Sequence, residues 1–472
     1  MTTIYLILLT LYLIVGIRIC RVKVKHPAVS RGASLRNPAK PGTPFLSLAS
    51  HRALWRRRVN NRYQHELSPT LILVLSYYMY SVAMPISRLC FDSAEMEYDA
   101  EYMLVQLLGA AGIIIGLLFQ RYHLGFVRNR NESSKQVSRI FRPLPALIIM
   151  SISVGIVMFG DLRGLGWDLS AIVKPYGYET TLLTGNREQT LFGQILWVLA
   201  ISSTALAFIG AYNTKNNKLI LFALLVGGLF GMFYMVRGSR NMAGMMIIPF
   251  IGAYLFSKPI KIKYLLLACL CIFFVVYIIG VVRNVGFGRL ADVPVKIETF
   301  DPLSQELGTN YRIFTTWKEM DPNKSLLLGK SYTTDVLYSM MPRYFWPDRP
   351  PGLCVQFSLD YFHLDSVDEL YLALGFSPIV EALVNFGRLG IVPVFALFSF
   401  LIAWLESWFK RHGAWGVSCY AFTILVVFNW NRMDMNMTLK ILIIYLVISK
   451  IFAIIIFPRK RKDIYRRRTL AA

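Results

Sequence analysis

The stretch LILFALLVGGLFGMFYMVRGSRNMAGMMIIPFIGAYLFS, residues 219–257, decides the fold. It contains two apolar runs, each about long enough to cross a bilayer as a helix, on either side of a short turn. The turn carries Arg237 and Arg240, which are three residues apart. Two such runs joined by so short a connection predict a pair of neighbouring membrane helices.

The same apolar signal recurs along the whole chain. Hydrophobic residues make up 55% of the 472 residues, and the mean hydropathy is +0.48, far too apolar for a soluble two-domain protein. We therefore expect an all-α fold, a polytopic integral membrane protein forming a single domain over 1–472 with about 11 transmembrane helices. The predicted spans lie near 2–19, 69–88, 103–120, 144–160, 191–211, 219–236, 241–257, 264–282, 389–405, 413–430 and 438–457.

Charged residues divide the connections between these spans into two sets. When alternate connections are assigned to the cytoplasm, they carry 32 Lys and Arg residues, and their only acids are Glu66, Glu132, Glu406 and Asp463. This asymmetry follows the positive-inside rule, so we expect the N-terminus outside and the C-terminus inside. Basic residues follow the first apolar segment instead of preceding it, which favours an anchor over a secretory signal peptide.

The cytoplasmic basic charge is concentrated next to predicted spans. It includes a segment over 21–68 and a tail over 458–472 that contains RKRKDIYRRR. Beside a membrane, such charges attract anionic lipid head groups and fix orientation. We therefore expect membrane lipids as partners and no nucleic acid, despite the net charge of +24.

The largest element outside the membrane is a loop over 283–388, on the outer side by the charge argument. Long loops without secondary structure are uncommon in compact proteins and are usually functional. Part of this loop is expected to be helical, because Asp301 and Pro302 form a helix start signal. Two outer cysteines, Cys90 and Cys354, leave a disulfide as an open alternative.

Motifs of soluble enzymes find no support. The stretch LLLGKS lacks the first glycine of a phosphate-binding P-loop, because Lys324 occupies that position. We interpret the outer cluster of Asp360, His363, Asp365 and Asp368 as solvated loop residues, and we expect no metal and no cofactor.

Arginines on the outer side are the unusual cations of this sequence. Any single one is explained by snorkelling, in which the long stem lies on apolar surface and the charge reaches water. As a group they indicate a site for an anionic, lipid-embedded substrate, because the guanidinium fork binds phosphate oxygens bidentately. They are Arg88, Arg237, Arg240, Arg283, Arg289, Arg343, Arg349 and Arg432.

Four outer acids are candidates for proton transfer. A carboxylate held beside apolar surface and arginines can take a proton from an attacking hydroxyl. For each acid alone, a solvated or ion-paired role is the simpler interpretation. The candidates are Glu306, Asp348 and Glu381, with Asp434 behind them.

Three segments resemble the Wzy-type oligosaccharide repeat unit polymerases. They are RGSRNMAG (237–244), GKSYTTDVLYSMMPRYFWPDRPPG (329–352) and SPIVEALVNFGRLGIVPVF (377–395). The strongest match is MPRYFWPDRP, residues 341–350, where family members tend to carry Pro, Arg and then Trp-Pro, followed by an acid and a basic residue before Pro. Arg349 stands where the family usually has Lys, which keeps the charge.

The resemblance implies a membrane glycosyltransferase of the bacterial inner membrane, with its active site facing the periplasm. Such a polymerase moves a growing glycan from its polyprenyl diphosphate carrier to a sugar hydroxyl of a carrier-linked repeat unit. Donor and acceptor are both polyprenyl-diphosphate-linked glycans, and the product is a surface polysaccharide such as an O-antigen or exopolysaccharide. A chain-length regulator and a flippase are the protein partners that the resemblance suggests.

The resemblance also suggests roles for individual residues. Trp346 is expected to stack on a sugar ring, with an aromatic wedge between helices as the alternative. The other expected roles are diphosphate binding by Arg237, Arg240, Arg343 and Arg349, and general base catalysis by one of Glu381, Glu306 and Asp348.

Two other functions stay open at this point. One is an O-antigen ligase, which the Trp-Pro motif disfavours. The other is a lipid-linked oligosaccharide flippase or transporter, which predicts charged residues at mid-membrane. Lys440 and Lys450 in the last span are the few candidates for such charges.

Overall fold

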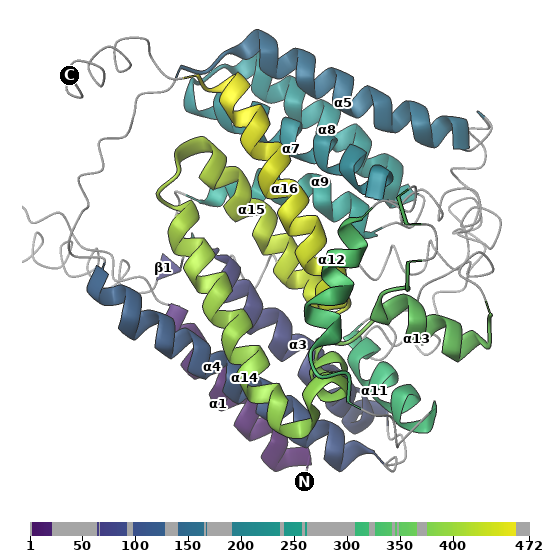
Figure 1. The fold of residues 1–472 in the computed structure, drawn as a ribbon. Coiled ribbons are helices and arrows are strands. Elements are labelled where there is room, and N and C mark those ends of the chain that lie inside the picture. The colour runs from purple at the N-terminus through teal and green to yellow at the C-terminus, as the bar shows by residue number, and fades with distance from the viewer. Residues whose placement is uncertain are drawn as a thin grey trace, which may run out of the picture.

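The computed structural model describes most of the predicted helical part of the chain. Within the described residues almost all regular structure is helical (Figure 1), which confirms the predicted helical fold. The described residues are 2–20, 64–65, 67–91, 98–127, 140–164, 167, 191–236, 240–256, 260–261, 307–320, 326–341, 345–346, 349–365 and 375–458.

Within these ranges, nine helices are long and apolar enough to cross a membrane. The protein is therefore a polytopic helical membrane protein. The seventh predicted span, 241–257, forms α9 (Arg240–Leu255), a helix of 16 residues, and the predicted span 264–282 lies outside the described residues. The nine helices are α1 (Thr2–Cys20), α3 (Pro69–Phe91), α4 (Asp99–Val127), α5 (Pro143–Gly164), α7 (Leu191–Asn213), α8 (Asn217–Val236), α14 (Pro378–Phe409), α15 (Gly413–Trp430) and α16 (Met435–Ile456).

The predicted long loop, 283–388, contributes four short helical elements. They are α11 (Thr309–Met320), the 3₁₀ helix η5 (Lys330–Tyr332), α12 (Thr334–Met340) and α13 (Leu353–Phe362). The loop is thus partly helical, as the sequence predicted, although the start signal at Asp301 and Pro302 lies outside the described residues. In Figure 1 these elements lie near the first residues of α14 and α16.

Two hydrophobic clusters build the interior. One joins α5, α7, α8 and α9 to α15 and α16, and the other joins α1, α3, α4 and α11 to α14. Trp430, at the end of α15, belongs to the second cluster and packs on Phe398 with ring centroids 3.8 Å apart. The helices α15 and α16 therefore connect the two halves of the bundle, and α16 also packs against η5 and α12.

Close contact between α4 and α14 depends on small residues. A Cβ added at Gly112 of α4 would lie 2.6 Å from the carbonyl oxygen of Val392 and 2.8 Å from the Phe395 Cβ. In membranes, small residues allow helix backbones to approach this closely and gain packing energy. This contact fixes the long part of α14 against α4.

Gly387 divides α14 into two helical segments. Its backbone has φ 69° and ψ −170°, a non-helical conformation that favours glycine. The carbonyl groups of Val384 and Asn385, just before the kink, accept hydrogen bonds from the N–H groups of Leu327 and Leu328. The kink therefore sets off a short first segment, 378–386, that is joined to the loop helices.

We expect Gly387→Ala to lower the free energy of unfolding by about 1–2 kcal/mol, because alanine is strained at positive φ. The added Cβ meets no atom within 4 Å, so strain is the only cost. Thermal unfolding of the detergent-solubilised protein measures the change. Gly155→Ala in α5 also meets no atom within 4 Å, and it should not lower the midpoint. A Gly387→Ala protein as stable as the parent would contradict the expected strain.

Candidate functional site

Buried polar side chains gather where η5, α12, the first segment of α14 and the start of α16 meet. Glu381 and Asn385 come from α14, Ser331 from η5, and Asp434 is the N-cap of α16. All four are buried, and α12 and η5 pack against α16. Three parts of the chain that are far apart in sequence thus place polar groups in one region.

Glu381 is the centre of this polar cluster and is 0% exposed. Its Oε1 accepts a hydrogen bond from the Ser331 hydroxyl at 2.6 Å, and its Oε2 accepts one from the Met435 N–H at 2.8 Å. The Met435 N–H belongs to the first turn of α16, where backbone donors lack helical partners and a negative charge is favoured. Glu381 therefore ties α14 to both η5 and α16.

Asn385 fixes the direction of the Ser331 hydroxyl. Its Nδ2 donates to Ser331 Oγ at 2.8 Å and to the Glu381 carbonyl oxygen at 2.8 Å, while its Oδ1 accepts from the Gly329 N–H at 3.0 Å. Because Ser331 Oγ receives a proton from Asn385, its own proton points to Glu381. Both oxygens of Glu381 are thus acceptors, as in an ionised carboxylate.

Asp434 caps α16 and holds the start of α13. Its Oδ1 accepts from the Met437 N–H at 2.9 Å, and its Oδ2 accepts from the Cys354 N–H at 3.2 Å. Burial raises the pKa of Asp434, and these two N–H donors partly oppose the rise. Like Glu381, this carboxylate uses both oxygens to join elements of the fold.

Asp335 differs from the other two acids because its carboxylate is uncommitted. It lies in the first turn of α12, is 7% exposed, and has no hydrogen-bond or ion-pair partner in the part of the chain that the structure describes. Burial raises the pKa of Asp335, the Lys330 charge lowers it and the Asp434 charge raises it further. A partly buried, unpaired carboxylate with a raised pKa is suited to accept a proton.

The sequence interpretation did not include Asp335. The residue lies in GKSYTTD, inside the second family-like segment and four positions after Ser331. Its place in a family-like segment could have identified Asp335 as a candidate, but Asp348 was the only acid of that segment that was considered. The distinguishing property, a carboxylate without a partner, depends on tertiary contacts.

Two cations lie at the same place. Arg349 Nη1 donates to the carbonyl oxygens of Tyr338, Ser339 and Met341, at 2.9, 3.1 and 2.7 Å, at the C-terminal end of α12. Lys440 of α16 is buried and lies within electrostatic reach of Arg349 and Asp434. The structure therefore gives Arg349 a role in capping α12 that the sequence did not indicate.

The remaining predicted residues are placed only in part. Trp346 is 37% exposed, and its ring packs edge-on against the Tyr338 ring at 4.9 Å, so it covers the end of α12 and keeps free surface. The residues Arg237, Arg343, Asp348 and Glu306, and the side chains of Arg240 and Cys90, lie outside the described part of the structure.

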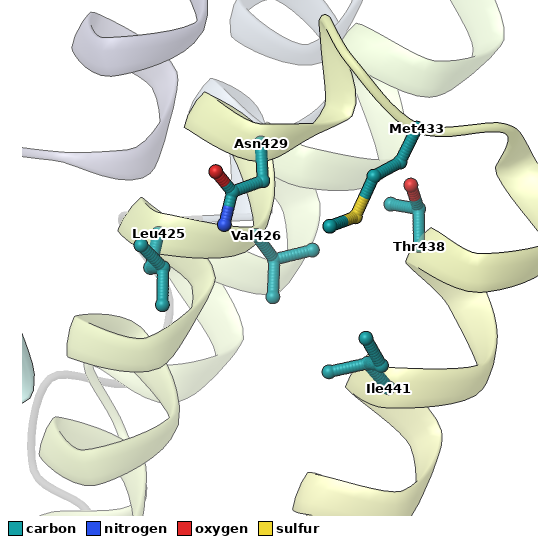
Figure 2. Close-up of a pocket in the computed structure, with 6 residues that line it drawn as sticks. All are labelled: Leu425, Val426, Asn429, Met433, Thr438 and Ile441. Carbon is teal, nitrogen blue, oxygen red and sulfur yellow. The ribbon is translucent and has the colours of Figure 1, made fainter. Parts of the chain in front are cut away.

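A small, mostly apolar pocket lies between the last turns of α15 and the first turns of α16. Figure 2 shows Leu425, Val426 and Asn429 of α15 across from Thr438 and Ile441 of α16, with Met433 on the connection. The Thr438 hydroxyl donates to the carbonyl oxygen of Asp434 at 2.9 Å, which links this pocket to the polar cluster.

Comparison with known proteins assigns the chain to a family. A family model described as O-antigen polysaccharide polymerase Wzy matches residues 59–462. No curated protein and no solved structure matches the chain. The matched range contains η5, α12, α13 and α14–α16, and with them all the residues of the polar cluster. The chain therefore belongs to the O-antigen polysaccharide polymerase Wzy family, membrane enzymes that act on lipid-linked oligosaccharide repeat units.

Proposed function

We propose that this protein extends a surface glycan on the periplasmic face of the bacterial inner membrane, and that the polar cluster around Asp335 is its active site. The observation that carries the proposal is the Asp335 carboxylate, which is buried, has no partner among the described residues and lies within electrostatic reach of Lys330, in a member of this polymerase family. An acid and cations side by side suit a reaction that removes a proton and releases an anion.

The predicted assignment of the connections to the two sides of the membrane agrees with the contacts between these connections. The strands β1 (Gln64–His65) and β2 (Ile260–Lys261), both in predicted cytoplasmic connections, pair with each other. The loop helices instead pack at the start of α14 and α16, which the charge rule assigns to the outside. Segments assigned to one side are therefore neighbours in space, which supports the predicted orientation.

The proposed reaction is a single displacement at the anomeric carbon of the donor glycan. A hydroxyl oxygen of the carrier-linked acceptor attacks this carbon, and the bond from the carbon to the phosphate oxygen of the polyprenyl diphosphate breaks. The hydroxyl proton passes to Asp335, and the lipid diphosphate leaves with the bonding electron pair. Neither a cofactor nor a nucleotide sugar enters this balance.

The other residues then have distinct roles. Glu381, whose two oxygens are committed to Ser331 and Met435, positions η5 and α16 around the reacting groups. Arg349, together with Arg237, Arg240 and Arg343 from the family-like segments, supplies positive charge for the diphosphate. Trp346 offers a ring face to a sugar. Glu306 and Asp348 remain candidates for proton transfer on sequence grounds.

Reconstitution tests the proposed reaction and separates it from the two alternatives. Liposomes containing the protein and carrier-linked repeat units, with no other glycan acceptor, should yield a ladder of longer carrier-linked glycans on a gel. A ligase would leave single repeat units in this assay. A flippase would move the repeat unit between leaflets without lengthening it, so the absence of a ladder contradicts the proposal.

Chain extension should fall at acidic pH with a midpoint above the ordinary aspartate value of about 4. The base works when it is ionised, and burial raises the pKa of Asp335, so the rate rises as pH increases through that pKa. Initial rates across the acidic range give the midpoint. Lys330→Met removes a charge that lowers this pKa and should move the midpoint further up. A midpoint at the ordinary value, unmoved by Lys330→Met, would exclude Asp335 as the base.

A further inference from the structure

Lys440 is a charged residue buried inside a membrane helix. It is the sixth residue of α16 and is 4% exposed. At about 1.5 Å per residue, its Cα lies roughly 8 Å along the helix from Met435, still near the outer end of the span. The helices η5 and α12 pack against α16. Lys440 is therefore a buried residue within the first two turns of α16.

The Lys440 ammonium has no hydrogen-bond or ion-pair partner among the residues that the structure describes. Asp434 is within electrostatic reach, but its two oxygens accept the N–H groups of Met437 and Cys354. Arg349 is also within reach and repels the ammonium. A buried ammonium without a partner is unfavourable, and such intramembrane charges usually have a function.

The two lysines of α16 differ in what their ammonium groups contact. Lys450, nearer the other end of the helix, places its ammonium 4.1 Å from the centre of the Trp415 ring and gains a cation–π contact. Lys440 has no such contact in the described part of the structure, although the residue is only 4% exposed. The two lysines thus form a natural pair for comparison.

We propose that Lys440 binds a phosphate oxygen of the lipid diphosphate from the membrane side of the site. This inference rests on the proposed function, because it names the anion that the Lys440 and Arg349 charges receive. An anion with more than one negative charge satisfies both cations at once. When the glycosyl bond breaks, the same charges stabilise the departing diphosphate.

The test uses the full-length protein in detergent, with inorganic diphosphate as the probe. Diphosphate should raise the thermal unfolding midpoint of the parent protein, because a ligand that binds only the folded state stabilises it. Lys440→Met should weaken diphosphate binding by about 10- to 100-fold, the usual effect of removing a hydrogen bond to a charged group. Lys450→Met should bind diphosphate as the parent does.

A second measurement separates ligand binding from a structural role. Without ligand, Lys440→Met should unfold at the same or a higher temperature than the parent, because it removes a buried charge that lacks a partner. A large loss of stability, or unchanged diphosphate binding, would overturn the inference. If the parent binds diphosphate through Lys440 but builds no ladder, the anion site stands and the polymerisation proposal fails. If Lys440→Met builds the parent's ladder at the parent's rate, the polymerisation proposal stands and the role of Lys440 fails.

Discussion

Asp335→Asn should lower the rate of chain extension by about 10²- to 10⁴-fold, the usual contribution of a positioned general base. Asparagine has almost the same shape as aspartate but cannot take the hydroxyl proton. The aspartate side chain has no hydrogen-bond partner among the described residues, so the change breaks no described contact. Burial also raises the pKa of Asp335, so loss of its charge should leave the thermal midpoint unchanged or higher.

The measurement is the initial rate of ladder formation in liposomes at saturating repeat unit, with the thermal midpoint measured in parallel. Asp360→Asn is the matched control, because Asp360 lies on α13 and accepts a hydrogen bond from Gln356 at 2.8 Å, outside the polar cluster. It should extend glycans at about the parent rate. An Asp335→Asn protein with the parent's rate would remove Asp335 from the reaction and return attention to Glu306, Asp348 and Glu381.

Glu381→Gln should both destabilise the protein and stop chain extension. The carboxylate accepts from Ser331 and from Met435, so an amide must turn its NH₂ group toward one of these two donors. A buried donor left without an acceptor costs about 1–3 kcal/mol. The loosened junction would no longer hold η5 and α12 against α16.

Ser331→Ala provides the graded comparison for Glu381→Gln. It removes the hydrogen bonds of the Ser331 hydroxyl to Glu381 and from Asn385 and leaves the Met435 N–H in place, so we expect a loss of about 1–3 kcal/mol. Chemical or thermal unfolding of both variants shows which of them loses more stability, and ladder assays show which loses more activity. Glu381→Gln as stable as the parent would show that this junction does not depend on the carboxylate.

The membrane fold could be predicted from the sequence because each apolar window carries its own evidence. A segment in lipid must satisfy its backbone hydrogen bonds internally, and a helix does so from local residues alone. One boundary was missed: the predicted span 389–405 became α14, which starts at Pro378 and bends at Gly387. The bend depends on hydrogen bonds from Leu327 and Leu328, which local periodicity does not contain.

The candidate site was predictable only where a motif named a residue. Glu381 was identified from SPIVEALVNFG, yet the sequence did not show that both of its oxygens are committed to distant segments. Arg349 was proposed for diphosphate, and its contacts with the end of α12 were not foreseen. Asp335 was overlooked, and Lys440 was considered only as a possible charge of a flippase or transporter. The property that makes both residues significant is that neither has a partner among the described residues, which the sequence does not show.

The sequence by itself determined that this is a helical, multi-span membrane protein, and its motifs indicated the family. Hydrophobic length and charge asymmetry act locally, so they can be read without knowing which helices touch. Tertiary structure alone decided which acid and which cation lack partners among the described residues. Partnership depends on contacts between segments that are 50 or more residues apart, such as the hydrogen bonds of Glu381 with Ser331, 50 residues away, and with Met435, 54 residues away. Burial then gives an unpaired charge its energetic significance, because a polar group in an apolar interior is stable only when something binds it.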